Sequence, residues 1–284
     1  MSSIFGGIYY DDKLNPAMSL VDKNLSPLSI EGTISFDTSQ RHCIGWHDLS
    51  SGKSQACPDK ATTDNKYDTC PACQKRTGFN PAFYHATSIS PQQEARNAQP
   101  HILYLAYMGS SYVKVGISWA QRGIRRLLDQ GARSAIILDT FSTALIARQY
   151  EASIANLPNI HETTPTRTKL QLLAQPYDQN TAQKSLIQTL ENIESSLKTK
   201  FNAKDPIHFD EYYQINDSLP ANFTELKNPM ISGKSVAIIG DILFMQHNDR
   251  HVALPLKRFT GYKVSVTSTI APLELPAEQV SLFG

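Results

Sequence analysis

The clearest alternation of apolar and polar residues lies in the middle of the chain. Two apolar runs, residues 102–107 and 112–117, are joined by Met108-Gly109-Ser110-Ser111, and this order predicts a β-hairpin. The apolar side chains of the second run alternate with Tyr112, Lys114, Gly116 and Ser118. Successive side chains of a strand point to opposite faces, so these residues should share one exposed face. Such a row of polar groups is a candidate site.

Helices and a further strand are predicted after the hairpin. Residues 119–130 carry apolar side chains at helical spacing and end at Gly131, which is typical of a helix C-terminus. Residues 134–140 then predict a strand, and residues 143–155 predict a second helix. The middle of the chain therefore predicts a small sheet with flanking helices.

The flanking parts of the chain add one helix and more strands. Residues 29–36 alternate as a strand, and residues 183–200 carry a single apolar stripe that indicates an amphipathic helix. Beyond Pro229, several β-rich runs are separated by Gly, Asp, Asn and Pro. This pattern favours a small antiparallel sheet or barrel near the C-terminus.

All four cysteines of the chain lie in one segment with the spacing C-x13-C-x12-C-x2-C. Zinc takes four thiolates in tetrahedral geometry, and a C-x2-C turn presents two of them to one ion. The surrounding residues 41–85 are too polar to build a core of their own and need another staple. We therefore predict one structural zinc ion bound by Cys43, Cys57, Cys70 and Cys73. A closed four-thiolate site leaves no position for a catalytic water.

Other interpretations of the cysteines remain open at this point. The thiols could form two disulfides, act in redox chemistry or lie buried without a partner. Three histidines nearby in the sequence could also replace a ligand. These are His42, His47 and His85.

The length of the chain, 284 residues, suffices for two or three modules, and its composition is ordinary for a globular protein. We expect an α+β fold in three parts. Residues 1–95 should form an N-terminal β and four-cysteine zinc-binding region, and residues 96–175 a domain built on the small central sheet with its flanking helices. Residues 176–284 should form a helix and a small β-rich module.

The charge of the chain is informative only locally. Its formal net charge is +1, yet residues 110–148 carry about four more positive than negative charges. The N-terminus lacks a basic region followed by a long apolar run, so we expect a cytoplasmic protein without a signal peptide. No apolar stretch approaches the roughly 18–20 residues that cross a bilayer, which argues against a membrane partner.

Several motifs of the central region resemble the GIY-YIG nuclease superfamily. They are Leu103-Tyr104, the run Lys114-Val115-Gly116-Ile117-Ser118, the arginine-bearing helix that follows and the segment 147–151. The second motif is most similar to branches that write it Lys-Val/Ile-Gly-x-Ser/Thr. Together with the cysteine segment, the same motifs resemble a bacterial family of unknown function. The likeness covers residues 40–155.

The resemblance implies a site for phosphodiester hydrolysis. In the superfamily a tyrosine assists deprotonation of the attacking water, an arginine stabilises phosphate charge, and a glutamate holds a divalent ion such as Mg²⁺ or Mn²⁺. Carried over by position, these roles fall on Tyr104, on Arg125 or Arg126, and on Glu151. A cation and a metal ion that neutralise the transition state while a base orients water form coherent chemistry.

The chain also departs from the superfamily pattern. Its first motif is Ile102-Leu103-Tyr104 instead of Gly-Ile-Tyr, and Lys114 stands where the second motif usually has tyrosine. Tyr112, on the same predicted face, could replace that tyrosine in part.

Further residues are candidates for binding nucleic acid. Gln130 ends the arginine helix, and Arg122 lies in its first turn. Basic and aromatic residues interleave at Lys257, Arg258 and Tyr262, a pattern that suits stacking on bases and contact with phosphates.

Each candidate also has a structural interpretation. The tyrosines can be half-buried strand aromatics, the arginines a solvated helix face, and Glu151 the partner of Arg148 on its own helix. Gln130 can simply end its helix, and the C-terminal lysines can lie along a β-turn.

The sequence leaves three functional hypotheses. The first is a cytoplasmic zinc-containing protein that cleaves DNA or RNA with Mg²⁺. The second is an inactive RNA- or DNA-binding adaptor on tRNA, the ribosome or a repair complex. The third is a protein-interaction scaffold.

Overall fold

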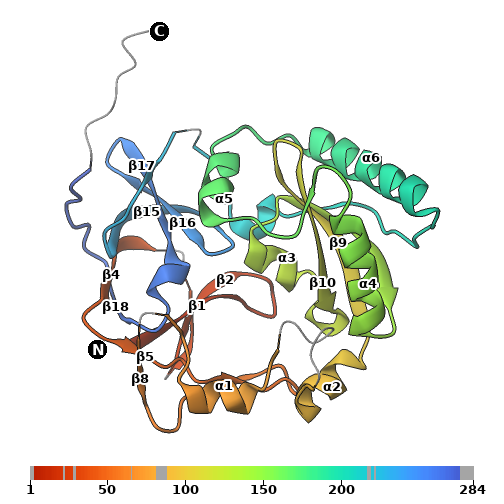
Figure 1. The fold of residues 1–284 in the computed structure, drawn as a ribbon. Helices are drawn as coiled ribbons and strands as arrows, with labels where there is room; N and C mark the ends of the chain where they lie inside the picture. Colours follow the sequence, from red (N-terminus) through yellow and green to blue (C-terminus); the bar gives the residue numbers. More distant parts are fainter. Residues whose placement is uncertain are drawn as a thin grey trace.

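In the computed structural model, the described residues are 3–21, 23–27, 30–64, 66–80, 88–215, 219–220 and 222–275. They form two large sheets that lie side by side, with the cysteine segment across one end of both (Figure 1). The cysteine segment contains two further two-stranded sheets, in which β5 (Arg41–His42) pairs with β8 (Thr62–Thr63) and β6 (Trp46–His47) pairs with β7 (Ser54–Gln55). The predicted α+β class is therefore confirmed. Within the described residues, the structure contains no helix of the length and apolarity that crossing a membrane requires.

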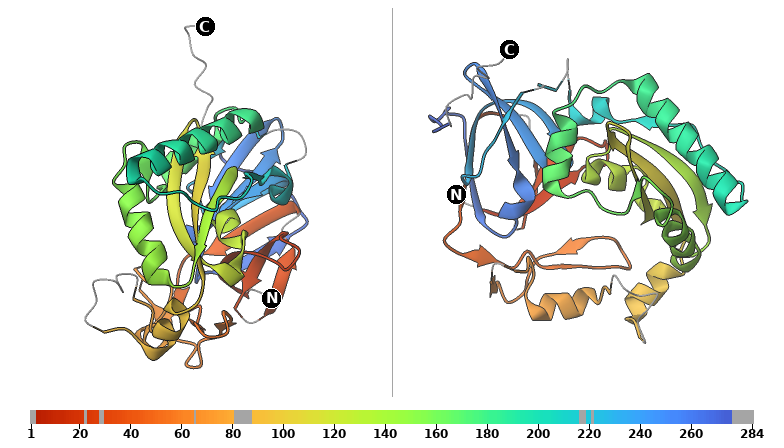
Figure 2. Two further views of the ribbon diagram at one scale, coloured as in Figure 1. Left: turned by 90° about the vertical axis from the view of Figure 1, so that its right-hand side faces the viewer. Right: turned by 45° about the horizontal axis from the view of Figure 1, so that its top comes forward.

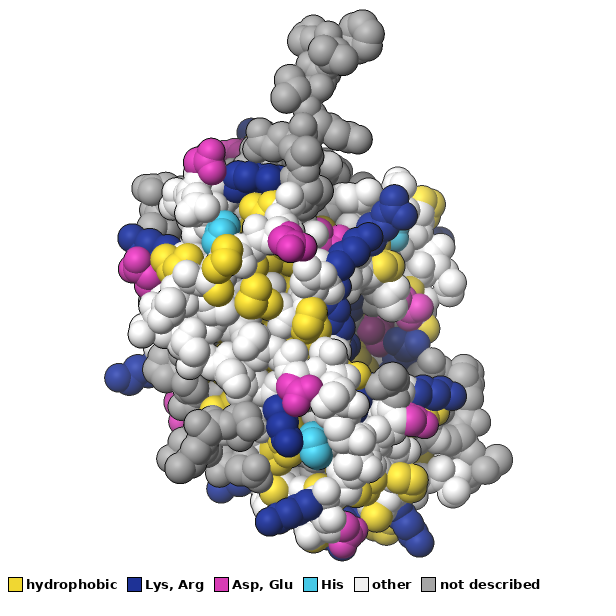
Figure 3. Space-filling view, turned by 90° about the vertical axis from the view of Figure 1, so that its left-hand side faces the viewer, with side chains coloured by type: hydrophobic (Ala, Val, Ile, Leu, Met, Phe, Trp, Pro, Cys, Tyr) yellow, Lys and Arg dark blue, Asp and Glu magenta, His cyan; other side chains and the backbone are white. Residues whose placement is uncertain are grey.

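The larger sheet has nine strands in the order β14-β17-β16-β15-β4-β18-β1-β2-β3. Its strands are β1 (Ser3–Tyr10), β2 (Pro16–Leu20), β3 (Lys23–Pro27), β4 (Glu31–Asp37), β14 (Thr224–Glu225), β15 (Met230–Ile239), β16 (Ile242–His247), β17 (Arg250–Pro255) and β18 (Lys263–Thr267). Neighbouring strands are antiparallel except for β14 and β17. Seen from outside, this side of the molecule carries a row of Lys and Arg side chains beside hydrophobic ones (Figure 3).

This large sheet combines strands from both ends of the chain. β18 pairs with β1 on one side and β4 on the other, and β4 also pairs with β15. One hydrophobic core contains Phe5 and Ile34 from the N-terminal strands together with Leu254 from a C-terminal strand. Segments that the sequence analysis placed in different modules thus share a sheet and a core.

The central sheet has five strands in the order β12-β10-β9-β11-β13. Its strands are β9 (His101–Gly109), β10 (Tyr112–Trp119), β11 (Ser134–Phe141), β12 (Ile160–His161) and β13 (Ile207–His208). β9 and β10 form the expected hairpin, in which Tyr104 faces Gly116. Ser110 and Ser111 take left-handed φ angles of 42° and 61°, as a tight hairpin turn requires.

Helices cover one face of the central sheet (Figure 2). The helices of the described residues are α1 (Pro71–Thr77), α2 (Pro91–Asn97), α3 (Arg125–Gln130), α4 (Ala144–Ala155), α5 (Thr166–Leu173) and α6 (Gln179–Leu197), and of these α4 and α6 lie on that face. The short 3-10 turns are η1 (Ala120–Arg122), η2 (Asp210–Tyr213) and η3 (Leu256–Phe259). Ile154 of α4 and Ile193 of α6 pack on this face against Leu105 of β9. α6 is the predicted amphipathic helix.

The helix predicted over residues 119–130 is shorter in the structure. It divides into η1 and α3 because Gly123 takes a left-handed φ of 54° that interrupts helical geometry. α3 ends at Gly131, which takes φ 74°, as the sequence predicts.

The second face of the central sheet packs against the large sheet. Tyr104 and Ala106 of β9 share a hydrophobic core with Ile239 of β15 and Phe244 of β16. The alternation of β10 is as predicted, with Val113 and Val115 on the helix side. The predicted exposure of the polar face is wrong, because the large sheet covers much of it and leaves Tyr104 only 1% exposed.

Candidate functional site

The four cysteines form one compact cluster. Their Sγ atoms all lie within 4.8 Å of one another, and those of Cys57 and Cys70 are 4.0 Å apart. Tetrahedral ligands about 2.3 Å from a zinc ion would be separated by roughly 3.8 Å, which is close to this arrangement. All four thiols are free and buried, so the disulfide alternative does not apply to this structure. The cluster could hold a metal ion such as zinc.

Local backbone geometry brings the cysteines together. Cys70 precedes α1, whose first residue is Pro71, so that Cys73 lies in its first turn on the same side. The backbone amides of Cys70 and Gly45 donate to Cys43 Sγ at 3.1 Å and 3.4 Å. Gly45 has φ 98° and lies so close to the Gln55 carbonyl that no side chain fits. Amide donors of this kind favour a thiolate.

Thiol pKa values agree with a site that needs a cation. Burial raises the pKa of Cys43 and of Cys73, whereas the Cys73 amide lowers the pKa of Cys70. Buried thiolates are stable only beside a positive charge, and a bound metal ion supplies it. Among the described residues the metal-ligand cluster consists of cysteines alone, without His42 or His47, and His85 lies outside those residues.

A second cluster is centred on Tyr104 in the central sheet. The Tyr104 ring lies directly over Gly116, where an added Cβ atom would be 2.4 Å from the phenol oxygen. Gln130, the last residue of α3, donates from Nε2 to Tyr104 Oη at 3.0 Å. Burial raises the pKa of Tyr104, while Arg126 and the Gln130 hydrogen bond oppose this shift. The sequence-predicted tyrosine, glycine and glutamine thus meet in space.

Lys114, Arg126 and Glu151 lie around this tyrosine. Burial, followed by the repulsion of Arg126, lowers the pKa of Lys114 to about 8, while Glu151 and Glu162 oppose the shift. Burial raises the pKa of Glu151, against the attraction of Arg148 and Lys114. The charges of Arg126 and Glu151 thus act on both Tyr104 and Lys114. Lys114 and Arg126 border the cavity described below, whereas Tyr104 and Glu151 are not among its lining residues.

Glu151 is already paired within its helix. Arg148 Nη1 lies 2.5 Å from Glu151 Oε2, and its Nη2 lies 3.3 Å from Glu162 Oε1. The structural interpretation of Glu151 is therefore seen directly. A metal ion bound by Glu151 would have to share the carboxylate with Arg148 or displace Arg148 from it.

Two predicted catalytic residues lie outside this cluster. Arg125 donates to Tyr9 Oη at 2.9 Å and to the Asp11 carbonyl at 3.1 Å, which fastens α3 to the N-terminal hairpin. Tyr112 stacks on His161, with ring centroids 3.8 Å apart, and its hydroxyl donates to the Thr163 carbonyl at 2.9 Å. Both contacts explain these side chains structurally.

Of the three C-terminal candidates, two have structural contacts and one borders a cavity. Arg258 donates to the Leu226 carbonyl and lies 5.0 Å from the centroid of the Phe259 ring. Tyr262 has the Arg41 guanidinium 5.7 Å from its ring centroid. Lys257, on η3, instead borders the cavity beside the Tyr104 cluster.

That cavity, about 590 Å³, lies between the central sheet and the large sheet. The predicted residues that line it are Lys114, Arg122, Arg126, Gln130 and Lys257. The cavity is also lined by Glu162, Thr164, Lys169 and Asp241, which belong to none of the motifs found in the sequence. Lys169 and Asp241 could not be found from the chain alone because they lie on α5 and on the β15–β16 turn and meet only by packing.

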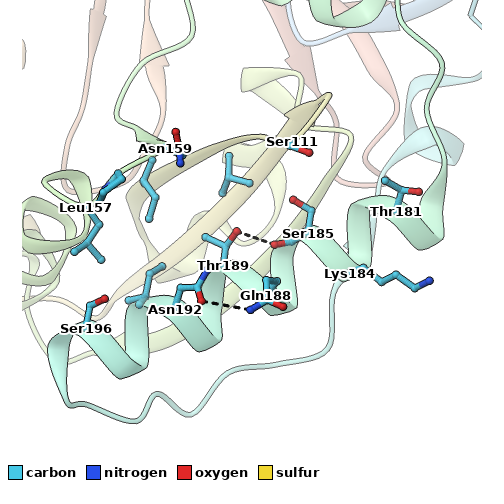
Figure 4. Close-up of a pocket in the computed structure, with 14 residues that line it drawn as sticks. Ser111, Leu157, Asn159, Thr181, Lys184, Ser185, Gln188, Thr189, Asn192 and Ser196 are labelled. Carbon is cyan, nitrogen blue, oxygen red and sulfur yellow. Dashed lines mark hydrogen bonds between the residues drawn. The ribbon is translucent and has the colours of Figure 1, made fainter.

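A different groove of about 740 Å³ runs along α6 (Figure 4). Its lining is mostly uncharged and polar, including Ser185, Gln188 and Asn192, with Lys184 at one end. None of the predicted site residues borders it. The candidate site is therefore the cavity beside Tyr104.

We expect the Lys114 ammonium to titrate near pH 8, because burial lowers its pKa to about 8. Glu151→Gln removes a negative charge that favours the ammonium form, so the pKa should fall further. Arg126→Ala removes a repelling positive charge, so the pKa should rise. NMR titration of ¹³C-labelled lysine measures both shifts, and Lys114→Arg assigns the signal. A wild-type Lys114 that titrates like a free lysine, near pH 10.4, would contradict this placement.

Comparison with models of protein families shows that most of the chain is related to one family. A model described as a protein family of unknown function, DUF2797, matches residues 38–264. The chain belongs to the DUF2797 family. The matched region contains the cysteine cluster, the central sheet and every predicted residue of the cavity. Comparisons with curated proteins and with solved structures found no match.

Proposed function

We propose that this protein acts on nucleic acid as a Mg²⁺-dependent phosphodiester hydrolase of GIY-YIG type, and that its cysteine cluster holds a structural zinc ion. The proposal rests on one observation. Lys114 and Arg126 border one cavity, and the charges of Arg126 and Glu151 act on both Lys114 and the buried Tyr104 behind it. The resemblance assigned Tyr104, Arg126 and Glu151 to a single site, with Lys114 in place of the second tyrosine.

The chemistry of these groups fits phosphodiester hydrolysis. Water attacks phosphorus, the bond from phosphorus to one ester oxygen breaks, and that oxygen leaves with a proton. Tyr104, whose hydroxyl accepts a hydrogen bond from Gln130 and lies in the field of Arg126, would orient the water, and the proton that the water loses passes to the leaving oxygen. Arg126 stabilises the charge that develops on the phosphoryl oxygens.

Glu151 would hold the divalent ion. Mg²⁺ commonly takes one or two carboxylates together with substrate phosphates and waters, so a single glutamate can be sufficient. A bound ion would supply charge neutralisation at the phosphate. Arg148 would then turn fully toward Glu162, which it already approaches at 3.3 Å.

Zinc is the proposed ion of the cysteine cluster because four thiolates in a closed tetrahedron are its usual structural site. A reducing compartment such as the cytoplasm keeps such thiols available for metal.

The test is cleavage of labelled DNA and RNA with Mg²⁺ or with EDTA. Arg126→Ala and Glu151→Gln should each lower the cleavage rate by about 10²–10³-fold, since each removes stabilisation of transition-state charge. Arg167→Ala is the matched control, because Arg167 is exposed on α5 and does not border the cavity. Cleavage that persists unchanged in both Arg126→Ala and Glu151→Gln would refute the hydrolase.

A second function is favoured by the Arg148–Glu151 ion pair, which occupies the carboxylate that a catalytic metal needs. In that case the protein is an RNA- or DNA-binding adaptor. Binding without cleavage, weakened steeply by salt and by Arg126→Ala, would support the adaptor. Absence of binding and of cleavage would leave a role in protein interaction.

A further inference from the structure

The cavity beside Tyr104 carries cations from elements far apart in the sequence. Lys114 lies on β10, Arg126 on α3 and Lys257 on η3 of the C-terminal part. None of these cations forms an ion pair with a carboxylate of the described residues. The remaining cations of the cavity are satisfied, because Arg122 pairs with Asp129 at 2.5 Å and Lys169 with Asp241 at 3.0 Å.

Unpaired cations gathered in a half-enclosed space favour an anionic ligand. Lys114 is partly buried and is repelled by Arg126, and although Glu151 and Glu162 act on its ammonium from a distance, neither forms an ion pair with it. A phosphate group bears enough negative charge and acceptor oxygens to contact several such donors at once. The three cations without an ion pair are therefore suited to contact a phosphate group.

Two residues that border the same cavity carry buried side-chain oxygens without a hydrogen-bond partner, namely Gln130 Oε1 and Thr164 Oγ1. The Gln130 carbonyl oxygen can only accept a hydrogen bond, whereas the Thr164 hydroxyl can accept or donate one. The Gln130 amide nitrogen is engaged with Tyr104 Oη, which fixes the carboxamide in place. Inorganic phosphate at neutral pH offers few donors, whereas ribose hydroxyls and the amino groups of bases offer them.

We propose that the cavity binds a single nucleotide unit, with its phosphate on Lys114, Arg126 and Lys257 and its sugar or base toward Gln130 and Thr164. This inference rests on the proposed function and names its substrate class more closely. A volume of about 590 Å³ is that of a small-molecule site, as expected for one nucleotide taken out of a strand or at its end. The large sheet, through Lys257, completes the site.

The experiment measures binding by calorimetry in EDTA, where Mg²⁺-dependent hydrolysis cannot proceed. The probes are the four ribonucleoside monophosphates, each compared with its nucleoside. At least one monophosphate should bind about ten-fold or more tightly than its nucleoside, because charge-assisted contacts to phosphate are lost. Lys257→Gln should lower the affinity for that monophosphate by a similar factor. Lys234→Gln is the matched control, since Lys234 is an exposed lysine of β15 that does not border the cavity.

A free nucleotide and the terminal nucleotide of a strand present the same phosphate, sugar and base groups. A further pair of probes distinguishes these two ligands. These are a trinucleotide with a 5′-phosphate and the same trinucleotide without it. Tighter binding of the phosphorylated trinucleotide than of the monophosphate identifies a strand end, and the reverse order identifies a free nucleotide. Both results support the site.

Equal binding of monophosphate and nucleoside, or an unchanged affinity in Lys257→Gln, overturns the inference. Because binding is measured without Mg²⁺, this failure differs from failure of the hydrolase. Cleavage that depends on Glu151, together with absent nucleotide binding, rejects only the nucleotide site. Nucleotide binding without cleavage rejects only the hydrolase.

Discussion

Cys73→Ser is expected to abolish tight metal binding and to unfold the segment around residues 43–73. The Cys73 thiol is fully buried in the cluster, and a serine hydroxyl replaces a thiolate ligand poorly. Metal binding contributes about 10–16 kcal/mol to the folding of zinc-finger peptides, and much of that contribution should be lost. Beside the cysteines, only Trp46 and Ala61 among the described residues pack on this cluster, so no apolar core replaces the metal.

The measurements are elemental analysis, limited proteolysis and thermal unfolding. Wild-type protein should contain one zinc ion per chain, and the variant close to none, with new cleavage inside the cysteine segment. Gln55→Ala provides the control, because Gln55 is an exposed residue of the same segment. A Cys73→Ser protein that resists proteolysis as well as wild type would show that the cysteines act only as buried thiols.

Loss of the metal should also reach the cavity. Arg41 Nε donates to the Thr260 carbonyl at 2.8 Å, and the His42 amide donates to the Gly261 carbonyl at 2.7 Å. These bonds connect the cysteine segment to the turn that follows Lys257. Ile44 and Asp68 of the cysteine segment also border the cavity, so loss of the metal should weaken the binding of ligands there.

Gly116→Ala is expected to destabilise the fold and to displace Tyr104. The backbone of Gly116 lies outside the left-handed region, so alanine causes no backbone strain there. Its Cβ, however, would lie 2.4 Å from Tyr104 Oη and 2.6 Å from Tyr104 Cζ. The ring is 1% exposed and cannot move freely, so overpacking should cost about 1–3 kcal/mol and shift the proposed catalytic hydroxyl.

A double-mutant cycle in denaturant unfolding separates this clash from other effects. In a Tyr104→Leu background, Gly116→Ala should cost much less, because the ring is absent. In a Tyr104→Phe background the full cost should remain, because Tyr104 Cζ and Cε2 are themselves within 3.0 Å of the added carbon. If Gly116→Ala lowered the free energy of unfolding equally in all three backgrounds, the destabilisation would not come from the clash with the Tyr104 ring.

Local sequence patterns were sufficient for the central hairpin and its residues. The alternation of β10 placed Lys114 and Gly116 on one face, and the spacing of the cysteines indicated one metal-binding cluster. These features are decided within a few residues or by one chemical requirement, so they can be read from the chain. The break at Gly123 shows the limit, since apolar spacing continued through a residue whose φ interrupts the helix.

Long-range packing decided the remainder. The separation of Arg125 from Arg126 depends on which side of α3 meets Tyr9, and no helical pattern distinguishes these neighbours. Lys257 reaches the cavity only because the large sheet lies against the central one. The pairing of β18 with β1 and β4 joins residues more than two hundred positions apart.

By itself, the sequence determined the α+β class, the hairpin, the cysteine ligand set and the faces of β10. The tertiary structure alone decided that the polar face of the central sheet is covered and that a cavity remains at its edge. It also decided which cations of the cavity form ion pairs with carboxylates. The reason is physical: periodicity and ligand chemistry act locally along the chain, whereas burial and ion pairing depend on surfaces that meet only after folding.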